Sequence, residues 1–220
     1  MIRRHVTLKL ATSLDGRIAT SSGESRWITG EAARAEVHRM RAQVDAVMIG
    51  ASTARADAPS LLARTDPAPA RQPARVVVTT RLELPPEGRL FESLDQSPLI
   101  VFGAERASPA RQAILEAAGA RIEQVPRGSA GLDIGVVLER LAERGMGAIL
   151  AEGGGQLAAS LIAAHVVDRL EWLRAPILLG AEGRCAIGGL ALAALSHAPR
   201  WRRVALRELG PDLWESYERA

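Results

Sequence analysis

A single lysine, Lys9, stands in the stretch VTLKLATSLDG, and every other basic side chain apart from histidine is arginine. Alternating apolar residues predict a strand over 5–11, in which Lys9 shares one face with Thr7 and Ala11. Because an unpaired buried ammonium is costly, Lys9 must reach water, a carboxylate or a ligand. Either it extends to solvent from an edge strand, or it moves a proton, which lysine can do and arginine cannot.

A second group of polar residues precedes a predicted helix. The helix runs over 30–43 with Thr29 as N-cap, and GESRWIT places Ser25 and Trp27 directly before it. The exposed amides at a helix N-terminus favour anions. The segment is therefore either an anion-binding helix entry or a capped helix with a packed tryptophan.

Arg41 lies in the same predicted helix. On a helical wheel it is about 40° from Val37 and about 60° from Val44, inside the apolar stripe. An arginine that points inward needs an anionic partner, and a phosphate would serve well.

The stretch TARADAPSLLAR follows a predicted strand over 46–50 and contains Thr53, Asp57 and Arg64. Prolines and mixed polarity predict an irregular loop over 52–73. Loops that leave the carboxyl ends of strands in open α/β sheets commonly bind ligands. The alternative is a set of solvated loop charges.

AILAEGGGQLAAS, residues 148–160, combines a buried strand, the acid Glu152, three glycines and a helix. Consecutive glycines let a phosphate approach the backbone where the helix dipole favours negative charge. The segment is neither a G-x-G-x-x-G fingerprint nor a P-loop. A tight strand-to-helix turn without a ligand is the structural alternative.

The strand end RVVVTTR, residues 75–81, carries two hydroxyls and Arg81. Such a group suits an adenosine 2′-phosphate. On this pattern Thr80 is a candidate cofactor contact.

The elements that must position these residues alternate between strands and helices. This order predicts an α/β fold with a mostly parallel central sheet and helices on both faces. Beyond Asp168 no helix intervenes, and we expect antiparallel edge strands. No linker divides the chain, so we expect one domain over 1–220. The other predicted strands are 75–80, 98–102, 120–125, 147–152, 169–180, 201–209 and 212–220, and the other helices are 108–119, 132–145 and 156–165.

Composition excludes several classes of function. The 220 residues are 47% hydrophobic and 24% charged, with a formal net charge of +3 and no basic block, so we expect no nucleic-acid partner. No apolar run is long enough to span a bilayer, and with the single cysteine Cys185 no internal disulfide can form. The four histidines form no zinc motif. We therefore expect a cytoplasmic protein without a bound metal.

KLATSLDGRIA, SGESRWIT, the helix ending RMRAQ, GASTARADAPSLLAR and AEGGGQLAAS together resemble the reductase domain of bacterial riboflavin biosynthesis. The resemblance spans about residues 5–180 and is dense over 5–64 and 148–165. It implies a dihydrofolate-reductase-like fold. It also implies NADPH-dependent reduction of 5-amino-6-(5-phosphoribosylamino)uracil, with hydride transfer to C1′ of the ribose.

The resemblance also implies roles for individual residues, and these match the pattern-based candidates. Lys9, Asp57 and Glu152 would surround the ribose and C1′, with Lys9 helping to move a proton. The substrate would be bound by Ser25, Arg41, Leu61, Arg64 and Glu152. NADPH would be bound by Ala11, Trp27, Thr53, Asp57, Thr80, Gly154, Gly155, Gln156 and Leu157.

The chain departs from the family pattern at two positions, Ala58 and Thr79, where an acid is common. No deaminase segment accompanies the reductase motifs, so we expect a separate deaminase, or a substrate that is not yet deaminated. The resemblance further implies a homodimer. Two alternatives stay open: a pterin or dihydrofolate-type reductase, and a non-catalytic nucleotide-binding module.

Overall fold

The structure is a computed structural model that describes residues 3–26, 28–129 and 131–220. Its internal contacts divide the chain into two compact units. Unit 1 contains residues 3–4 and His38–Leu150, and unit 2 contains His5–Val37 and Ala151–Ala220. The single domain over 1–220 stays a prediction.

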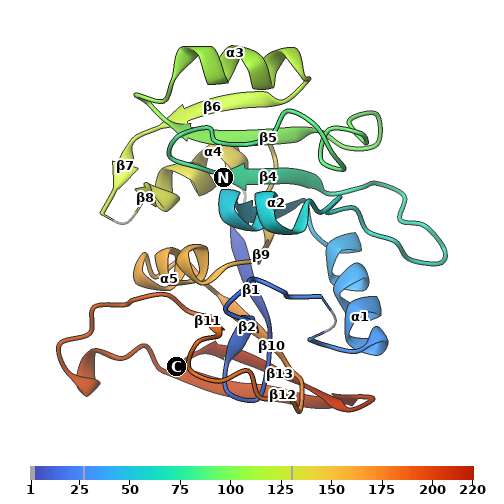
Figure 1. The fold of residues 1–220 in the computed structure, drawn as a ribbon, viewed down its shortest axis with the longest axis vertical. Coiled ribbons are helices and arrows are strands. Elements are labelled where there is room, and N and C mark those ends of the chain that lie inside the picture. Colours follow the sequence, from blue (N-terminus) through green and yellow to red (C-terminus); the bar gives the residue numbers. More distant parts are fainter. Residues whose placement is uncertain (1–2, 27, 130) are drawn as a thin grey trace. The chain divides into compact units, whose positions relative to one another are not determined.

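The strands of unit 1 form a parallel array. β3 (Ala46–Gly50), β4 (Ala74–Val78), β5 (Leu99–Ala104) and β6 (Arg121–Val125) pair in that order (Figure 1). β9 (Ala148–Glu152) starts in this unit, where Asp45 N–H donates to the Ala148 carbonyl at 2.8 Å. Apolar runs such as AVMIG, buried from Ala46 to Ile49, are typical of parallel strands covered on both faces. The corresponding predicted strands are confirmed to within two residues.

The helices of unit 1 are α2 (Ala51–Asp57), α3 (Pro109–Ala117) and α4 (Ile134–Glu143). Asp133 caps α4 by accepting from Val136 N–H at 3.2 Å, as expected for an N-cap aspartate. Predicted helices over 108–119 and 132–145 are therefore confirmed. The short strands β7 (Arg127–Gly128) and β8 (Gly131–Leu132) form a hairpin that the sequence did not indicate.

The predicted loop over 52–73 is wrong at its start, where α2 continues directly from β3. Seven residues are too few for a clear helical period, and such a short helix depends on tertiary packing. Ala54, 4% exposed, supplies that packing.

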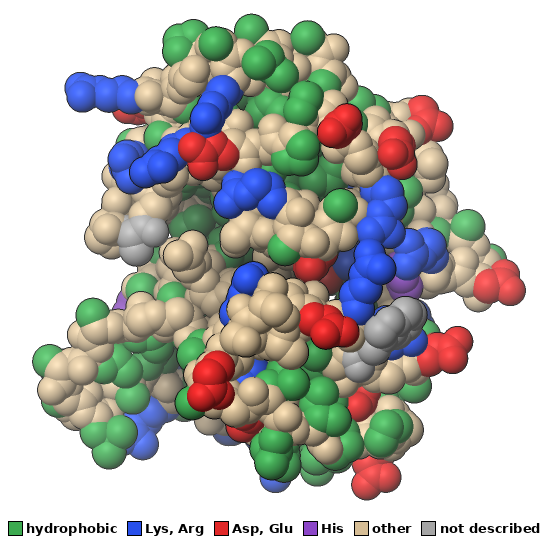
Figure 2. All heavy atoms as spheres, in the orientation of Figure 1, with side chains coloured by type: hydrophobic (Ala, Val, Ile, Leu, Met, Phe, Trp, Pro, Cys, Tyr) green, Lys and Arg blue, Asp and Glu red, His purple; other side chains and the backbone are tan. Residues whose placement is uncertain are grey.

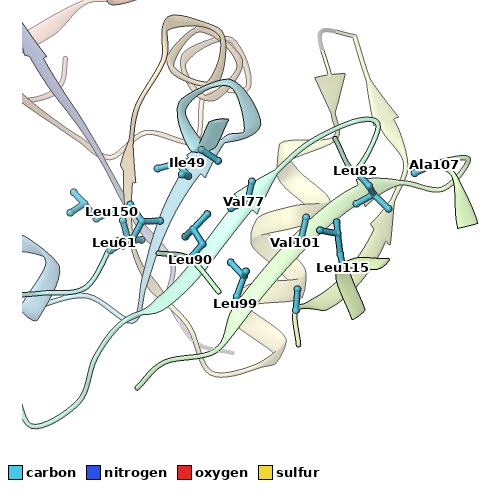
Figure 3. Packing of buried hydrophobic residues seen from close by; sticks show 13 residues of the cluster. Ile49, Leu61, Val77, Leu82, Leu90, Leu99, Val101, Ala107, Leu115 and Leu150 are labelled. Carbon is cyan, nitrogen blue, oxygen red and sulfur yellow. The ribbon is translucent and has the colours of Figure 1, made fainter. Parts of the chain in front are cut away.

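A hydrophobic core cluster organises one face of these strands. Val47 of β3, Val77 of β4 and Val101 of β5, all 0% exposed, pack with side chains from α2, α3 and the connecting loops. Figure 3 shows this cluster. Met40 and Val44, at the end of α1 (Glu31–Ala42), pack against the same cluster. In Figure 1, α4 lies behind the strands, and its buried residues are not members of this cluster.

Arg75 is a fully buried cation at the start of β4, with 0% exposure. Its guanidinium donates to the carbonyls of Leu90, Ser93 and Ser97 and to the Ser93 hydroxyl. Burial lowers the pKa of Arg75, and nearby Asp95 opposes that effect. The side chain thus joins β4 to the loop that carries its acceptors.

Unit 2 contains β1 (His5–Thr12), β10 (Arg169–Arg174), β13 (Asp212–Arg219) and β12 (Trp201–Leu209), paired in that order. The β1–β10 pair is parallel, whereas β10–β13 and β13–β12 are antiparallel. The expected antiparallel C-terminal strands are therefore confirmed, although the strand predicted over 169–180 ends at Arg174. Along β1 the odd-numbered residues are more exposed than the even-numbered ones, so the predicted alternation around Lys9 is confirmed too.

The rest of unit 2 consists of α5 (Gly155–Ala163), the 3₁₀ turn η1 (Leu195–His197) and a two-stranded ladder. β2 (Arg17–Ala19) pairs there with β11 (Arg184–Cys185). The predicted helix over 156–165 is confirmed near its bounds.

Charges on the face seen in Figure 2 are mixed, with acidic side chains among the basic ones. Across 3–26, 28–129 and 131–220, no helix combines the length and hydropathy required to cross a bilayer. Within the same residues no group of three or more His, Cys, Asp or Glu is arranged to hold a metal ion.

Candidate functional site

Lys9 lies in the middle of β1, half-buried, on the face that Thr7 and Ala11 share. β1 carries it because its even-numbered residues Leu8 and Leu10, each 1% exposed, fill the opposite face. The strand is well fixed at this point, because Leu8 and Leu10 are buried and β1 pairs with β10 along this stretch. Lys9 is thus held on a rigid element, as a reacting group should be.

The glycine turn after β9 is a specific conformation. Gly153 has φ of +121°, which L side chains rarely adopt. Gly154 follows as N-cap of α5 in extended geometry and, being glycine, has no side chain that could cap the helix. Helix geometry leaves the first amides of α5 without intrahelical acceptors. The turn therefore presents N–H donors, and buried Glu152, 7% exposed, ends the strand just before it.

Gly155 has a different reason to be glycine. A Cβ at this position would lie 2.6 Å from the Cys185 carbonyl oxygen and 3.0 Å from the Gly188 nitrogen. Gly188 N–H donates to the Gly155 carbonyl at 2.8 Å. Gly155 is therefore required by the packing of the 185–188 segment, and a phosphate at this turn stays a prediction. Next to it, Gln156 is exposed and Leu157 buried.

The β1–β2 turn holds the chain that covers Gly155. Asp15 accepts from the Ser13 hydroxyl and from the N–H groups of Leu179 and Gly180. The Ser13 hydrogen bond, together with these amides, lowers the pKa of Asp15 to about 2. Gly16, with φ of +75°, closes the chain reversal after Asp15. β2, which follows this turn, pairs with β11, and the exposed Cys185 lies in β11.

Ser25 is half-buried at the end of a turn in which Thr20 N–H donates to the Glu24 carbonyl at 2.9 Å. It precedes α1 by six positions, as the sequence indicated. The predicted cofactor contact Trp27 lies outside the described residues.

In unit 1, Thr53 and Asp57 belong to α2 rather than to a loop. Asp57 is the last residue of this helix and is exposed. A carboxylate at a helix C-terminus interacts unfavourably with the helix dipole. Its position therefore does not serve the stability of α2, which is consistent with a functional role.

The turn after α2 is strained. Ala58 has φ of 40° and Leu61 has φ of 60°, both in the left-handed region that non-glycine residues rarely occupy. Leu61 is 1% exposed and packs in the core cluster. Arg89 donates through Nε to the Ala58 carbonyl at 2.8 Å and through its terminal nitrogen to the Asp57 carbonyl at 3.2 Å. A cation thus holds the carbonyl end of α2.

Arg41 and Arg64 meet at one backbone segment, 62–64. The Arg41 guanidinium lies 3.4 Å from the Leu62 carbonyl oxygen. Arg64 N–H donates to His38 Nδ1 at 3.2 Å, and the Arg64 guanidinium lies 3.0 Å from His38 Nε2. A neutral imidazole has one acceptor nitrogen, so these two contacts are not both hydrogen bonds at once. The structure therefore brings the two predicted phosphate ligands together.

Thr80 follows β4 and is half-buried. The preceding Thr79 is 8% exposed, and its N–H donates to the Phe102 carbonyl at 3.0 Å. Arg81 has a side chain that is 78% exposed. Of the three polar side chains at this strand end, only that of Arg81 is largely exposed.

The sequence analysis missed His38, Arg89 and Glu171. His38 is three residues before Arg41, a helical spacing that places both on one face of α1, so its proximity could have been found. Arg89 sits in the irregular stretch after β4, and nothing in its neighbours points to α2. Glu171 was read only as part of a strand.

The family described as RibD C-terminal domain matches residues 4–214. The chain belongs to the RibD C-terminal domain family. It is 35% identical over 218 residues to the 2,5-diamino-6-ribosylamino-4(3H)-pyrimidinone 5′-phosphate reductase of Methanothermobacter thermautotrophicus, covering 98% of both chains. It spans little more than half the length of the bacterial RibD proteins that it matches.

Solved structures agree with this family. The RibD protein of Acinetobacter baumannii has a TM-score of 0.84 and 27% identity, covering 99% of this chain and 58% of that one. Dihydrofolate reductase from Enterococcus faecalis has a TM-score of 0.51 and 14% identity, over 100% of this chain and 99% of that one. The predicted dihydrofolate-reductase-like α/β fold is therefore confirmed. Membership of the RibD C-terminal domain family also implies a nicotinamide cofactor.

Proposed function

We propose that this chain reduces a 5-phosphoribosylamino-pyrimidine at C1′ of the ribose, with NADPH as the hydride donor, in riboflavin biosynthesis. The carrying observation is the full-length match to the Methanothermobacter thermautotrophicus reductase, over 98% of both chains. The name of that relative gives a diamino pyrimidinone, whereas the family resemblance suggested the deaminated uracil. Both are therefore candidate substrates.

The substrate phosphate is assigned to Arg41 and Arg64, with Ser25 as a further ligand. The Arg41 guanidinium approaches the Leu62 carbonyl, two residues before Arg64, and the Arg64 guanidinium lies 3.0 Å from Nε2 of His38, on the helix that carries Arg41. Planar guanidinium groups bind phosphate oxygens in pairs of parallel hydrogen bonds. Gln72 fixes the backbone between them, because its amide accepts from Ala63 N–H at 2.8 Å and donates to the Ala63 carbonyl at 2.9 Å.

The residues that would hold NADPH fit its anionic groups. The N-terminus of α5 offers main-chain donors without a side-chain cap at Gly154, and such a helix end favours a pyrophosphate. Thr53 on α2 and Ala11 on β1 are assigned to the same cofactor, as is Thr80 after β4. Bound NADPH would supply a hydride to C1′.

The chain's own chemistry is proton transfer at the ribose. When C1′ accepts the hydride, the C1′–O4′ bond breaks, its electron pair goes to O4′, and O4′ takes a proton. Lys9 is proposed to deliver that proton, while Asp57 and Glu152 orient the ribose hydroxyls. General acid catalysis of this kind contributes roughly 10²–10⁴-fold to a rate.

The test is to incubate the purified protein with NADPH and, separately, the deaminated and undeaminated phosphoribosylaminopyrimidines, following loss of NADPH absorbance. NADPH deuterated on the transferred position would show whether the label reaches C1′, by mass spectrometry and NMR of the product. Dihydrofolate is the control substrate for the pterin-type alternative.

Deuterium at C1′ of either pyrimidine product would confirm the proposal and identify the substrate. Turnover of dihydrofolate and of neither pyrimidine would show that the chain acts as a pterin-type reductase. Tight NADPH binding with no turnover would instead support a nucleotide-binding module and overturn the proposal.

The proposed reaction requires a deaminase that acts before or after it, and we propose that a separate protein supplies that step. A homodimer and a cytoplasmic location remain predictions. Analytical ultracentrifugation across a concentration series would test the dimer.

A further inference from the structure

A buried carboxylate lies beside Lys9, and none of the proposed roles uses it. Glu171 on β10 is the registered partner of Lys9 in the parallel β1–β10 pair. Registered residues of adjacent strands put their side chains on the same face, with backbones about 4.8 Å apart. Glu171 is 4% exposed, so its charge acts on its neighbours with little screening by water.

Three donors fix the Glu171 carboxylate. Arg169 Nε donates to one oxygen, and the Trp214 indole and the Ser216 hydroxyl donate to the other. Ser216 is the registered partner of Glu171 on β13. Because every partner is a donor, both oxygens serve as acceptors and the group has a single orientation.

We propose that Glu171 is a positioning residue that keeps the Lys9 ammonium protonated where the reduction takes place. The link to catalysis rests on the proposed function, while the electrostatic link to Lys9 does not. If the two charged groups lie about 5 Å apart, which adjacent strands allow, the carboxylate favours the protonated amine by roughly half a pH unit to two units, depending on the local dielectric. Arg169 offsets part of that charge, so we expect about one unit.

Other charged groups on this face are the same in the Glu171 and Glu215 variants compared below. Glu36 of α1 pairs with Arg207 of β12 at 3.4 Å, which places α1 over the same face of the sheet. Glu152 is a second buried carboxylate in unit 2. The remaining groups that share the face by strand register are His5, Arg169, Arg202, Glu218 and buried Asp212, which accepts from Gly30 N–H at 2.6 Å.

The composition of the chain makes a direct test simple. Lys9 is its single lysine, so protein labelled with ¹³C at lysine Cε, without a lysine-bearing tag, gives one side-chain signal. Its chemical shift titrates with the amine and needs no substrate. The Lys9→Arg variant, which must lose the signal, confirms the assignment.

Glu215→Gln is the matched control for Glu171→Gln. Glu215 is buried at 6% exposure on β13 and also accepts from arginines, Arg174 and Arg203. It is registered with Trp172, one position along β10 from Glu171, so it faces the opposite side of the sheet. Both substitutions remove one buried charge, but only one of these charges lies beside Lys9.

We expect Glu171→Gln to lower the Lys9 pKa by about one unit. In Glu171→Asp, which keeps the charge, the Lys9 pKa should stay close to the parent value, and in Glu215→Gln it should be unchanged. Coincident titration curves for the parent and Glu171→Gln would overturn the proposal, as would equal shifts in both glutamine variants. If Glu171→Gln does not fold, Arg169→Gln takes its place. That variant exposes Lys9 to the full carboxylate charge and should raise its pKa, and no rise would overturn the proposal.

An activity measurement connects this to the reaction. If Lys9 donates the proton, the basic limb of the kcat/KM profile should move to lower pH by the same amount in Glu171→Gln, and not in Glu215→Gln. An NMR shift without turnover in the parent would mean that the proposed function failed while the electrostatic link held. A titration shift with an unmoved profile would show that Glu171 does not act through Lys9 in catalysis.

Discussion

Each unit of the chain has a hydrogen-bonded charge buried on a strand, Arg75 in unit 1 and Glu171 in unit 2, and these two charges have different partners. Arg75 in unit 1 donates to three carbonyls and a hydroxyl of a single loop, residues 90–97. Glu171 in unit 2 accepts from an arginine, a tryptophan and a serine, and is registered with Lys9.

The different partners of Arg75 and Glu171 distinguish a buried charge that stabilises the fold from one that can influence a reaction. The partners of Arg75 are mainly backbone groups, so its charge holds a loop in place. The neighbours of Glu171 include a group that can change its protonation state, so its charge can also set that state. A buried charge by itself therefore indicates neither role, and its partners decide.

The largest expected effect is on the stability side of this comparison. Arg75→Leu removes the donors of several buried acceptors, each worth about 1–3 kcal/mol when left unsatisfied. We expect a loss of at least about 3 kcal/mol in unfolding free energy, measured by urea denaturation. Ser93→Ala, which removes one hydroxyl partner of Arg75, should cost about 1 kcal/mol. Equal losses in the two variants would contradict the assignment of Arg75 as the centre of the network.

Lys9→Arg tests the chemical side. The charge is retained, but arginine does not give up its proton, so turnover should fall by roughly 10²–10⁴-fold. The free energy of unfolding should change by less than about 0.5–1 kcal/mol. Steady-state kinetics and urea denaturation on the same preparation would show the two effects apart. Full turnover in Lys9→Arg would remove Lys9 from the mechanism.

Asp45 extends the comparison to a carboxylate in unit 1. Burial acts to raise its pKa, but hydrogen bonds from Ala148, Gly147 and Arg71 outweigh burial, and the pKa is lowered from 3.8. A carboxyl group whose pKa is lower in the folded protein stabilises the fold at pH values above its pKa in the unfolded chain. That stabilisation is lost as the pH falls through the pKa in the folded protein.

Asp45→Asn should therefore cost about 1–2 kcal/mol near neutral pH. This cost should shrink as the pH falls below about 4. Urea denaturation of both proteins at several pH values would measure it. A cost independent of pH would assign the effect to shape rather than to the carboxylate charge.

The smallest effect is expected at Arg89, where the two roles meet. Arg89→Ala leaves the Asp57 and Ala58 carbonyls to water, costing about 0.5–1.5 kcal/mol. If Asp57 acts on the substrate, its displacement should also lower kcat several-fold, and Arg89→Lys should recover part of it. Arg55→Ala is the control, since Arg55 is part of α2 itself and donates to the Glu83 carbonyl. Equal kinetic losses in both alanine variants would make the Arg89 effect a general weakening of α2.

Most elements could be predicted because their signals are local. The composition of AVMIG indicates a buried strand. Asp133 is a residue type that favours the N-cap position, and it caps α4. The helix α2 was missed because seven residues do not display a period, and its stability comes from Ala54 in the core. The grouping of Arg41 with a phosphate site was indicated by its place on the helical wheel, but the position of Arg64 beside His38 was not.

By itself, the sequence determined which groups are chemically capable: one lysine, two arginines suited to phosphate, and a glycine turn ahead of a helix. These depend on residue type and short spacing. Only the tertiary structure decided what surrounds them, because Glu171 is 162 residues from Lys9 along the chain and is registered with it only through strand pairing. The same holds for Gly155, where the close carbonyl of Cys185 requires a glycine. Local sequence specifies the reactive groups, whereas long-range packing sets their charge and position.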